Sequence, residues 1–144
     1  MSMDPKELVA RQLKMDEGSK THAYQDHNGY WTIGVGRNID QRNGRGLRQS
    51  EIDFMLANDI EDHEIELSRV FSGWDGFSVT RKAALLNLRH QLGLRGIINF
   101  KLMVKAIERE DWVTAGMELR DSAMYRDPLL TARTERRARE LTDG

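Results

Sequence analysis

Three polar residues, Glu17, Asp26 and Thr32, could together protonate and cut a polar bond. They lie nine and six residues apart in the segment DEGSKTHAYQDHNGYWTIGVG. This spacing places one carboxyl at the end of an expected helix, the other at a hairpin turn and the hydroxyl on the returning strand. An acid on one side of a bond and a carboxylate holding water on the other is the arrangement that inverting glycoside hydrolysis requires. The three residues are therefore the candidate catalytic group.

Each of these residues also has an ordinary structural explanation. Glu17 precedes a glycine, as residues at helix ends often do, and Asp26 opens a turn that contains Asn-Gly. Threonine is common in strands. The joint spacing, with small residues beside Thr32, is what favours catalysis over these explanations.

The element before Glu17 is predicted to be a helix. Asp4 is a suitable N-cap, Pro5 fits the first helical position, and Gly18 should end the helix.

A β-hairpin is predicted to follow. Its strands are residues 21–25 and 30–35, on either side of the turn Asp26–Gly29. The period of two places Thr32 on a face of small residues that we expect to be open. The polar, glycine-rich segment 38–46 could be a loop or a weak third strand.

The rest of the chain is predicted to be helical. Residues 49–70 lack glycine and proline and should form one long helix, about 30 Å in length. The expected fold class is α+β and mainly helical. It comprises a small N-terminal lobe with a β-hairpin or a three-stranded sheet, the long connecting helix, and an all-helical C-terminal lobe. We expect one domain, 1–144, in which 14–60 form the lobe with the hairpin and 1–13 and 61–144 are helical. The shorter helices are expected at 80–92, 99–108, 111–121 and, after Pro128, up to about Leu141.

Composition excludes several classes of protein. The 144 residues include no cysteine, so a thiol enzyme and a disulfide framework are excluded. The net charge of −1 argues against nucleic acid as a partner. No segment reads as a signal peptide or a membrane span, and the four scattered histidines predict no metal site. Four arginines cluster near the C-terminus: Arg133, Arg136, Arg137 and Arg139. We interpret them as a solvated helix face in preference to a binding site for a polyanion.

Several motifs resemble one known family. The runs DEG, YQD and YWTIGVG carry the candidate triplet, and RKAALLNLRHQLG at 81–93 and SAMYRDP at 122–128 extend the likeness over nearly the whole chain. Together they resemble the phage-type lysozymes of the T-even kind, glycoside hydrolase family 24. The resemblance implies a lysozyme-like fold and a muramidase that needs no cofactor. Its substrate would be the β-1,4 bond between N-acetylmuramic acid and N-acetylglucosamine in bacterial peptidoglycan.

The resemblance also implies roles for individual residues. Glu17 would be the general acid, while Asp26 and Thr32 would hold and activate water, which agrees with the chemistry argued above. Positions similar to those that contact saccharide in the family are Tyr24, Gly36, His90 and Gln91. For Gln91, a structural role at the helix end is the alternative.

One position departs from the family pattern. Arg37 stands where the family often has a histidine that pairs with an aspartate of the long helix, and Asp59 occupies the matching acidic position. We therefore expect a structural ion pair between Arg37 and Asp59.

Two alternatives to a muramidase stay open. A lytic transglycosylase would cut the same bond without water, and a non-catalytic wall-binding or virion module would keep only the fold. The phage context comes from the resemblance alone. It implies either an endolysin, made in the host cytoplasm and released through a holin to act on the periplasmic cell wall, or a domain of a larger virion protein. A monomer is expected.

Overall fold

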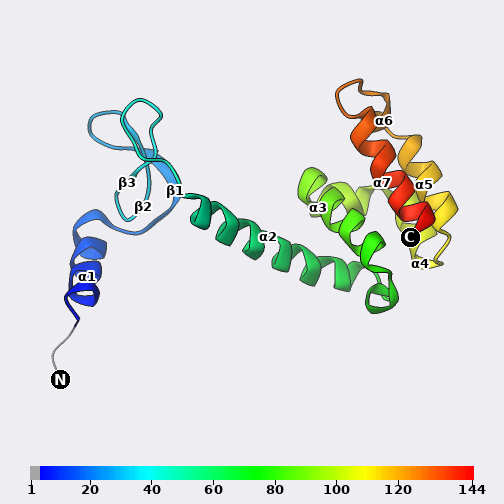
Figure 1. The fold of residues 1–144 in the computed structure, drawn as a ribbon, viewed down its shortest axis with the longest axis horizontal. Coiled ribbons are helices and arrows are strands. Elements are labelled where there is room, and N and C mark those ends of the chain that lie inside the picture. The colour runs from blue at the N-terminus through cyan, green and yellow to red at the C-terminus, as the bar shows by residue number, and fades with distance from the viewer. Residues whose placement is uncertain (1–3) are drawn as a thin grey trace. The chain divides into compact units, whose positions relative to one another are not determined.

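The computed structural model describes residues 4–144, and the chain divides into two compact units, Met1–Asp53 and Phe54–Gly144. Residues 1–3 of the predicted helical segment 1–13 lie outside the described residues. The α+β, mainly helical architecture is confirmed (Figure 1). That both units form one domain stays a prediction.

The first unit opens with the predicted helix, α1 (Pro5–Glu17). The Asp4 side chain caps it by accepting a hydrogen bond of 3.0 Å from the backbone N–H of Lys6. Gly18 ends it with φ 76°, a left-handed conformation that glycine adopts at little cost. Local sequence signals therefore determine where Glu17 lies, in the last position of the helix.

A three-stranded antiparallel sheet follows, in the order β1 (Lys20–Gln25), β2 (Trp31–Gly34) and β3 (Arg37–Asn38). The predicted hairpin is confirmed, and the uncertain segment 38–46 contributes only Asn38 to the short strand β3 before it becomes a loop. In the central strand, Thr32 lies between Tyr24 and Asn38. Thr32 itself is only 4% exposed, whereas a Cβ on Gly34, two residues further along the same face, would meet nothing within 4 Å. The space expected on this face therefore lies beside Thr32 and does not extend to Thr32 itself.

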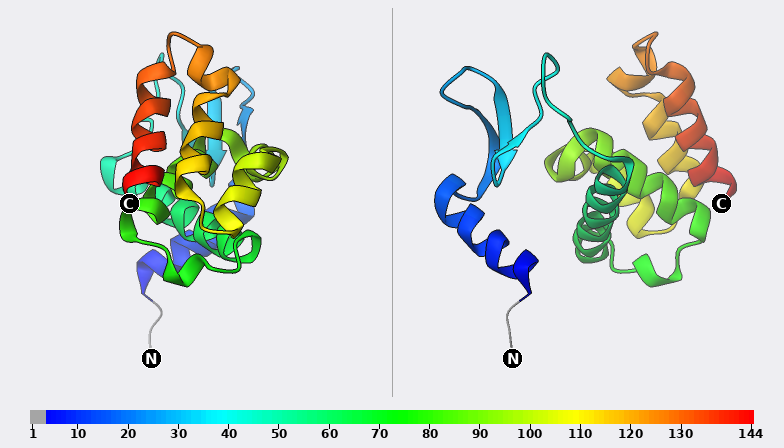
Figure 2. Two further views of the ribbon diagram at one scale, coloured as in Figure 1. Left: turned by 90° about the vertical axis from the view of Figure 1, so that its right-hand side faces the viewer. Right: turned by 60° about the vertical axis from the view of Figure 1, so that its left-hand side comes forward.

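The long helix, α2 (Gln49–Val70), has the bounds that its sequence predicts. It begins in the first unit and continues into the second. The second unit then consists of helices joined by short connections (Figures 1 and 2). These are η1 (Trp74–Gly76), α3 (Val79–Asn99), α4 (Lys101–Glu108), α5 (Trp112–Arg120), α6 (Ala123–Arg126) and α7 (Thr131–Asp143).

Two of these helices differ from expectation. α3 continues past the predicted stop at Gly93, but the helix is broken there, since Gly93 has φ 76° and ψ 164°. The four-residue helix α6 was not predicted, because one turn is too short to show a helical period.

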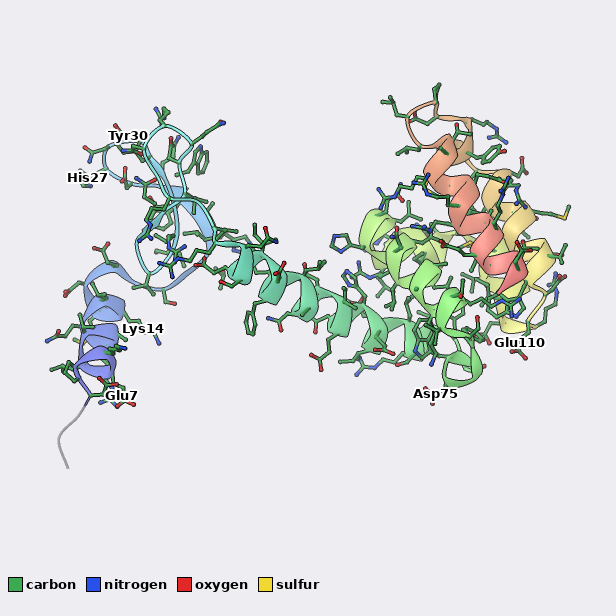
Figure 3. All side chains as sticks on the ribbon, viewed as in Figure 1. Glu7, Lys14, His27, Tyr30, Asp75 and Glu110 are labelled. Carbon is green, nitrogen blue, oxygen red and sulfur yellow. The ribbon has the colours of Figure 1, made fainter. Side chains whose placement is uncertain are left out.

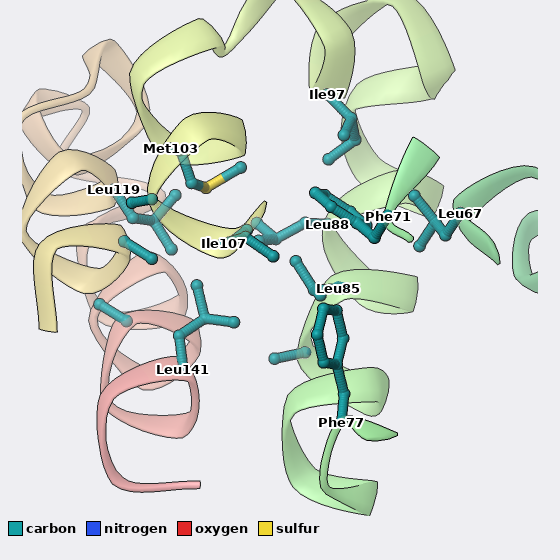
Figure 4. Close-up of a cluster of buried hydrophobic side chains, with 14 of the residues drawn as sticks. Leu67, Phe71, Phe77, Leu85, Leu88, Ile97, Met103, Ile107, Leu119 and Leu141 are labelled. Atoms are coloured by element: carbon teal, nitrogen blue, oxygen red, sulfur yellow. The ribbon is translucent and has the colours of Figure 1, made fainter. Parts of the chain in front are cut away.

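The hydrophobic core lies in the second unit (Figure 4). Every buried apolar side chain among the described residues stands at or beyond Leu67. α5 and α7 lie side by side (Figure 2), and a glycine permits their close approach: a Cβ on Gly116 would lie 3.0 Å from the carbonyl oxygen of Ala138. In residues 4–144, no helix is long and apolar enough to cross a membrane.

Candidate functional site

The Glu17 carboxyl lies against the turn between β2 and β3. A Cβ built on Gly36 would lie 3.0 Å from both Cδ and Oε2 of Glu17, so the acid occupies the space that a side chain at residue 36 would need. Gly36 has φ 66°, which also favours glycine. The helix end and the sheet thus meet at the candidate general acid.

Asp26 begins a closed turn, residues 26–30, which we call the Asp26 turn (Figure 3 labels His27 and Tyr30 in it). One carboxylate oxygen, Oδ1, accepts hydrogen bonds of 2.9 Å from the backbone N–H groups of Asn28 and Tyr30. The backbone N–H of Asp26 donates to the carbonyl of Tyr30, also at 2.9 Å. The Asp26 carboxylate is therefore held by its own turn, in an Asx geometry that its residue type favours.

Thr32 lies on β2, just after the Asp26 turn, and directly opposite Tyr24 of β1. Its hydroxyl donates a hydrogen bond of 3.0 Å to the carbonyl of Tyr30, the last residue of the Asp26 turn. Because a hydroxyl has one proton, Thr32 can only accept from a further partner.

The predicted partner of Arg37 is replaced by another residue. Its guanidinium binds both carboxylate oxygens of Glu51, with Nη1–Oε2 at 2.8 Å and Nη2–Oε1 at 3.1 Å, and Nη1 also donates to the carbonyl of Gly46. This pairing lowers the pKa of Glu51. Glu51 lies in the first turn of α2, where the loop after β3 arrives, whereas Asp59 lies about two turns further along the helix. The expected Arg37–Asp59 pair is thus corrected to Arg37–Glu51, which ties the sheet to the start of α2.

Sequence reasoning missed a buried acid beside the hairpin. Asp40, in the loop after β3, is 3% exposed and binds Arg42 through two hydrogen bonds of 2.8 Å. That pairing, with the backbone N–H groups of Trp31 and Arg42, holds the pKa of Asp40 well below its usual range. The Asp-x-Arg spacing in an Asn- and Gly-rich loop was the available signal, but burial of an acid cannot be read from sequence.

Two predicted saccharide contacts, His90 and Gln91, lie on α3 in the second unit. Nδ1 of His90 lies 3.0 Å from Nε2 of His63, a buried side chain of α2. Burial lowers the pKa of His63. The amide of Gln91 is half-buried and donates to the sulfur of Met124 at 3.7 Å, a contact that fits the structural alternative.

His90 also borders a pocket within the second unit, of about 360 Å³. A polar corner is provided by Asn87, whose side-chain oxygen accepts a hydrogen bond of 3.1 Å from Arg133. Within the described part of the chain, no three His, Asp or Glu side chains are grouped to hold a metal. The remaining lining of the pocket is apolar and consists of Leu56, Ile60, Ala83 and Leu86.

Comparison with known proteins gives the class of this molecule. Residues 14–140 match the phage lysozyme family. Similar proteins include probable T4-type lysozymes 1 and 2 of Dictyostelium discoideum, 27% and 28% identical, with 76% of this chain and 80% of each relative covered. The pre-baseplate central spike protein Gp5 of Enterobacteria phage T4 is 27% identical over 85% of this chain, which spans 26% of that protein.

These matches, with the α+β architecture of a small sheet, a long helix and a helical second unit, define a glycoside hydrolase of the lysozyme class. The chain belongs to the phage lysozyme family. It is a peptidoglycan hydrolase, as the resemblance implied.

Proposed function

We propose that this protein is a muramidase that hydrolyses the β-1,4 bond between N-acetylmuramic acid and N-acetylglucosamine with inversion of configuration. Glu17 donates the proton to the glycosidic oxygen, and Asp26 and Thr32 hold the attacking water. The observation that carries the proposal is the contact of the Glu17 carboxyl with the turn that follows the strand of Thr32. The acid and the water-holding residues are thereby parts of one small unit.

The hydrogen bonds of Asp26 and Thr32 support their role with water. Thr32 uses its proton on the carbonyl of Tyr30, and a carboxylate has no proton to donate, so both side chains are acceptors. A water between them gives one hydrogen to each and keeps its oxygen lone pairs for attack on the sugar. Inversion predicts that the carboxyls of Glu17 and Asp26 lie about 6.5 to 9.5 Å apart, which leaves room for that water.

The test uses matched variants and the chemistry of the products. Glu17→Gln keeps the size of the side chain but cannot donate a carboxyl proton, so clearing of purified cell walls should fall by at least about 100-fold. Asp16→Asn, one residue earlier on α1, is the matched control and should retain activity. Proton NMR of the first product should show the α-anomer, because inversion at a β-bond yields it. Initial release of the β-anomer would contradict inversion.

The same digest distinguishes a hydrolase from a lytic transglycosylase. A transglycosylase uses a hydroxyl of the muramic acid in place of water and leaves anhydromuramic ends, so Asp26 and Thr32 would be dispensable. We expect reducing ends and a large loss of activity in Asp26→Asn. A parent protein that binds walls without cutting them would instead indicate a non-catalytic module.

The biological setting has two forms, and the similarity to Gp5 favours examining the virion first. As a lysozyme domain of a larger virion protein, the sequence would be found by mass spectrometry in purified particles. As an endolysin it would be absent from particles, accumulate in the infected cytoplasm and depend on a holin for release to the periplasmic wall.

Light scattering of the purified chain tests whether it is a monomer. The saccharide contacts proposed at Tyr24, Gly36, His90 and Gln91 are tested by KM of single variants.

A further inference from the structure

Asp40 joins the loop after β3 to the start of β2. Its Oδ2 accepts a hydrogen bond of 3.0 Å from the backbone N–H of Trp31, and Oδ1 accepts one of 3.0 Å from the backbone N–H of Arg42. The guanidinium of Arg42 adds Nε–Oδ1 and Nη2–Oδ2 bonds, each of 2.8 Å. The buried carboxylate therefore fixes the guanidinium in one orientation, since a two-point contact leaves little freedom to rotate.

The same guanidinium reaches the Asp26 turn. Nη2 of Arg42 donates a hydrogen bond of 2.9 Å to the carbonyl of Gly29, thirteen residues earlier in the chain. The guanidinium carbon lies 4.9 Å from the ring centre of Tyr30, within the range of a cation–π contact. Gly29 and Tyr30 close the turn that Asp26 opens, so Arg42 contacts that turn on both its backbone and a side chain.

The guanidinium of Arg42 also lies within electrostatic range of Asp26. The hydrogen bonds to Asp40 raise the pKa of Arg42, and the nearby carboxylate of Asp26 adds a smaller contribution in the same direction.

We propose that Arg42 is a positioning residue for Asp26: its guanidinium, oriented by Asp40, holds the Asp26 turn in the shape that the water-holding carboxylate needs. The inference rests on the proposed role of Asp26. Arg42 acts through the turn rather than on the substrate. The planar, two-pronged guanidinium, the fork of Arg42, is essential because two of its nitrogens, Nε and Nη2, make all three contacts, two with Asp40 and one with Gly29.

The experiment compares three variants of the full chain on soluble glycan strands released from peptidoglycan. Arg42→Lys keeps the charge and loses the fork, Arg42→Gln loses both, and Arg45→Gln removes an exposed arginine from the same loop as the matched control. We expect kcat to fall about 10-fold in Arg42→Lys and more in Arg42→Gln, with KM within about twofold, because a small misplacement of a reacting group lowers the rate steeply. Arg45→Gln should match the parent.

A double-variant cycle shows whether the effect passes through Asp26. In an Asp26→Asn background, Arg42→Gln should leave the residual kcat within about twofold, since the group that it positions is already inactive. If Arg42→Gln lowered kcat as much in the Asp26→Asn background as it does in the parent protein, the inference would be overturned. An unchanged kcat in Arg42→Lys would overturn it too. The melting temperature of each variant is measured beside its activity. If Arg42→Gln does not fold, Arg42→Lys still tests the need for the guanidinium, because it keeps a cation beside Asp40. Full activity of Asp26→Asn alone would refute the role of Asp26 and the inference with it.

Discussion

Replacing Gly36 by alanine should move the general acid without disturbing the rest of the fold. The new Cβ would lie 3.0 Å from Cδ and Oε2 of Glu17 and 3.1 Å from Cγ, whereas ordinary contacts begin at 3.4 Å. The Glu17 carboxyl is the end of a flexible side chain, so it gives way by a few tenths of an ångström. Because a 1 Å misplacement can lower a rate by about 100-fold, we expect a loss of roughly 10-fold in kcat/KM, about 1.4 kcal/mol in the barrier.

Gly34 provides the matched control for this substitution. Its φ of 67° equals that of Gly36 within one degree, yet a Cβ at Gly34 would meet nothing within 4 Å. Both alanine variants should therefore lose a similar stability, about 1–2 kcal/mol for a left-handed non-glycine residue. Only Gly36→Ala should also lose activity.

The assay measures kcat/KM on soluble glycan strands beside the melting temperature of each variant. Equal activity of Gly34→Ala and Gly36→Ala, at equal melting temperatures, would refute the reasoning that Gly36 leaves space for the acid. A crystal structure of Gly36→Ala with an unmoved Glu17 carboxyl would do the same.

Three further predictions concern the second unit. Arg120, with Arg139, lowers the pKa of Glu135 from 4.5 to about 2. Since the folded pKa lies below the unfolded one, the stabilisation by this pairing is complete above about pH 4.5 and is lost as the pH falls towards 2. The melting temperature of Glu135→Gln should therefore depend less on pH between pH 5 and 3 than that of the parent. Burial lowers the pKa of His63 from 6.5. Because the unfolded chain then binds the proton more readily than the folded protein does, the folded protein loses stability as the pH falls below about 6.5. The melting temperature of His63→Gln should decline less from pH 7 to 5 than that of the parent, and an unchanged slope would contradict this. Gly116→Ala should cost about 1–3 kcal/mol in urea unfolding because its Cβ would press on Ala138 and Thr142 of α7, while Gly76→Ala, with nothing within 4 Å, is the control.

The elements of the fold could be predicted where the signal is local. The bounds of α2 agree with its sequence because an uninterrupted helical period without glycine or proline leaves few alternatives. The N-terminal helix has a capping aspartate, a proline and a terminal glycine, each with a direct physical effect. α6 is too short to carry such a signal.

Side-chain partners were harder to predict. Asp40 is a buried acid in a polar loop, and only the return of that loop to Trp31 explains its burial. For Arg37, the family pattern indicated an acid on the long helix, and the structure uses Glu51 on that helix because it lies nearer the loop. Residue types indicated charge pairing, but the chain path selects the partner.

The distribution of buried apolar side chains has a consequence for the cooperativity of unfolding. Among residues 4–144, all of them stand at or beyond Leu67, whereas the buried residues described in the first unit are Thr32 and Asp40, both polar. Segments with few buried apolar contacts open at lower free energy than the core does. Denaturant or heat should then inactivate this enzyme by a local opening around the sheet while the helical core stays folded, so loss of activity precedes loss of helical circular dichroism.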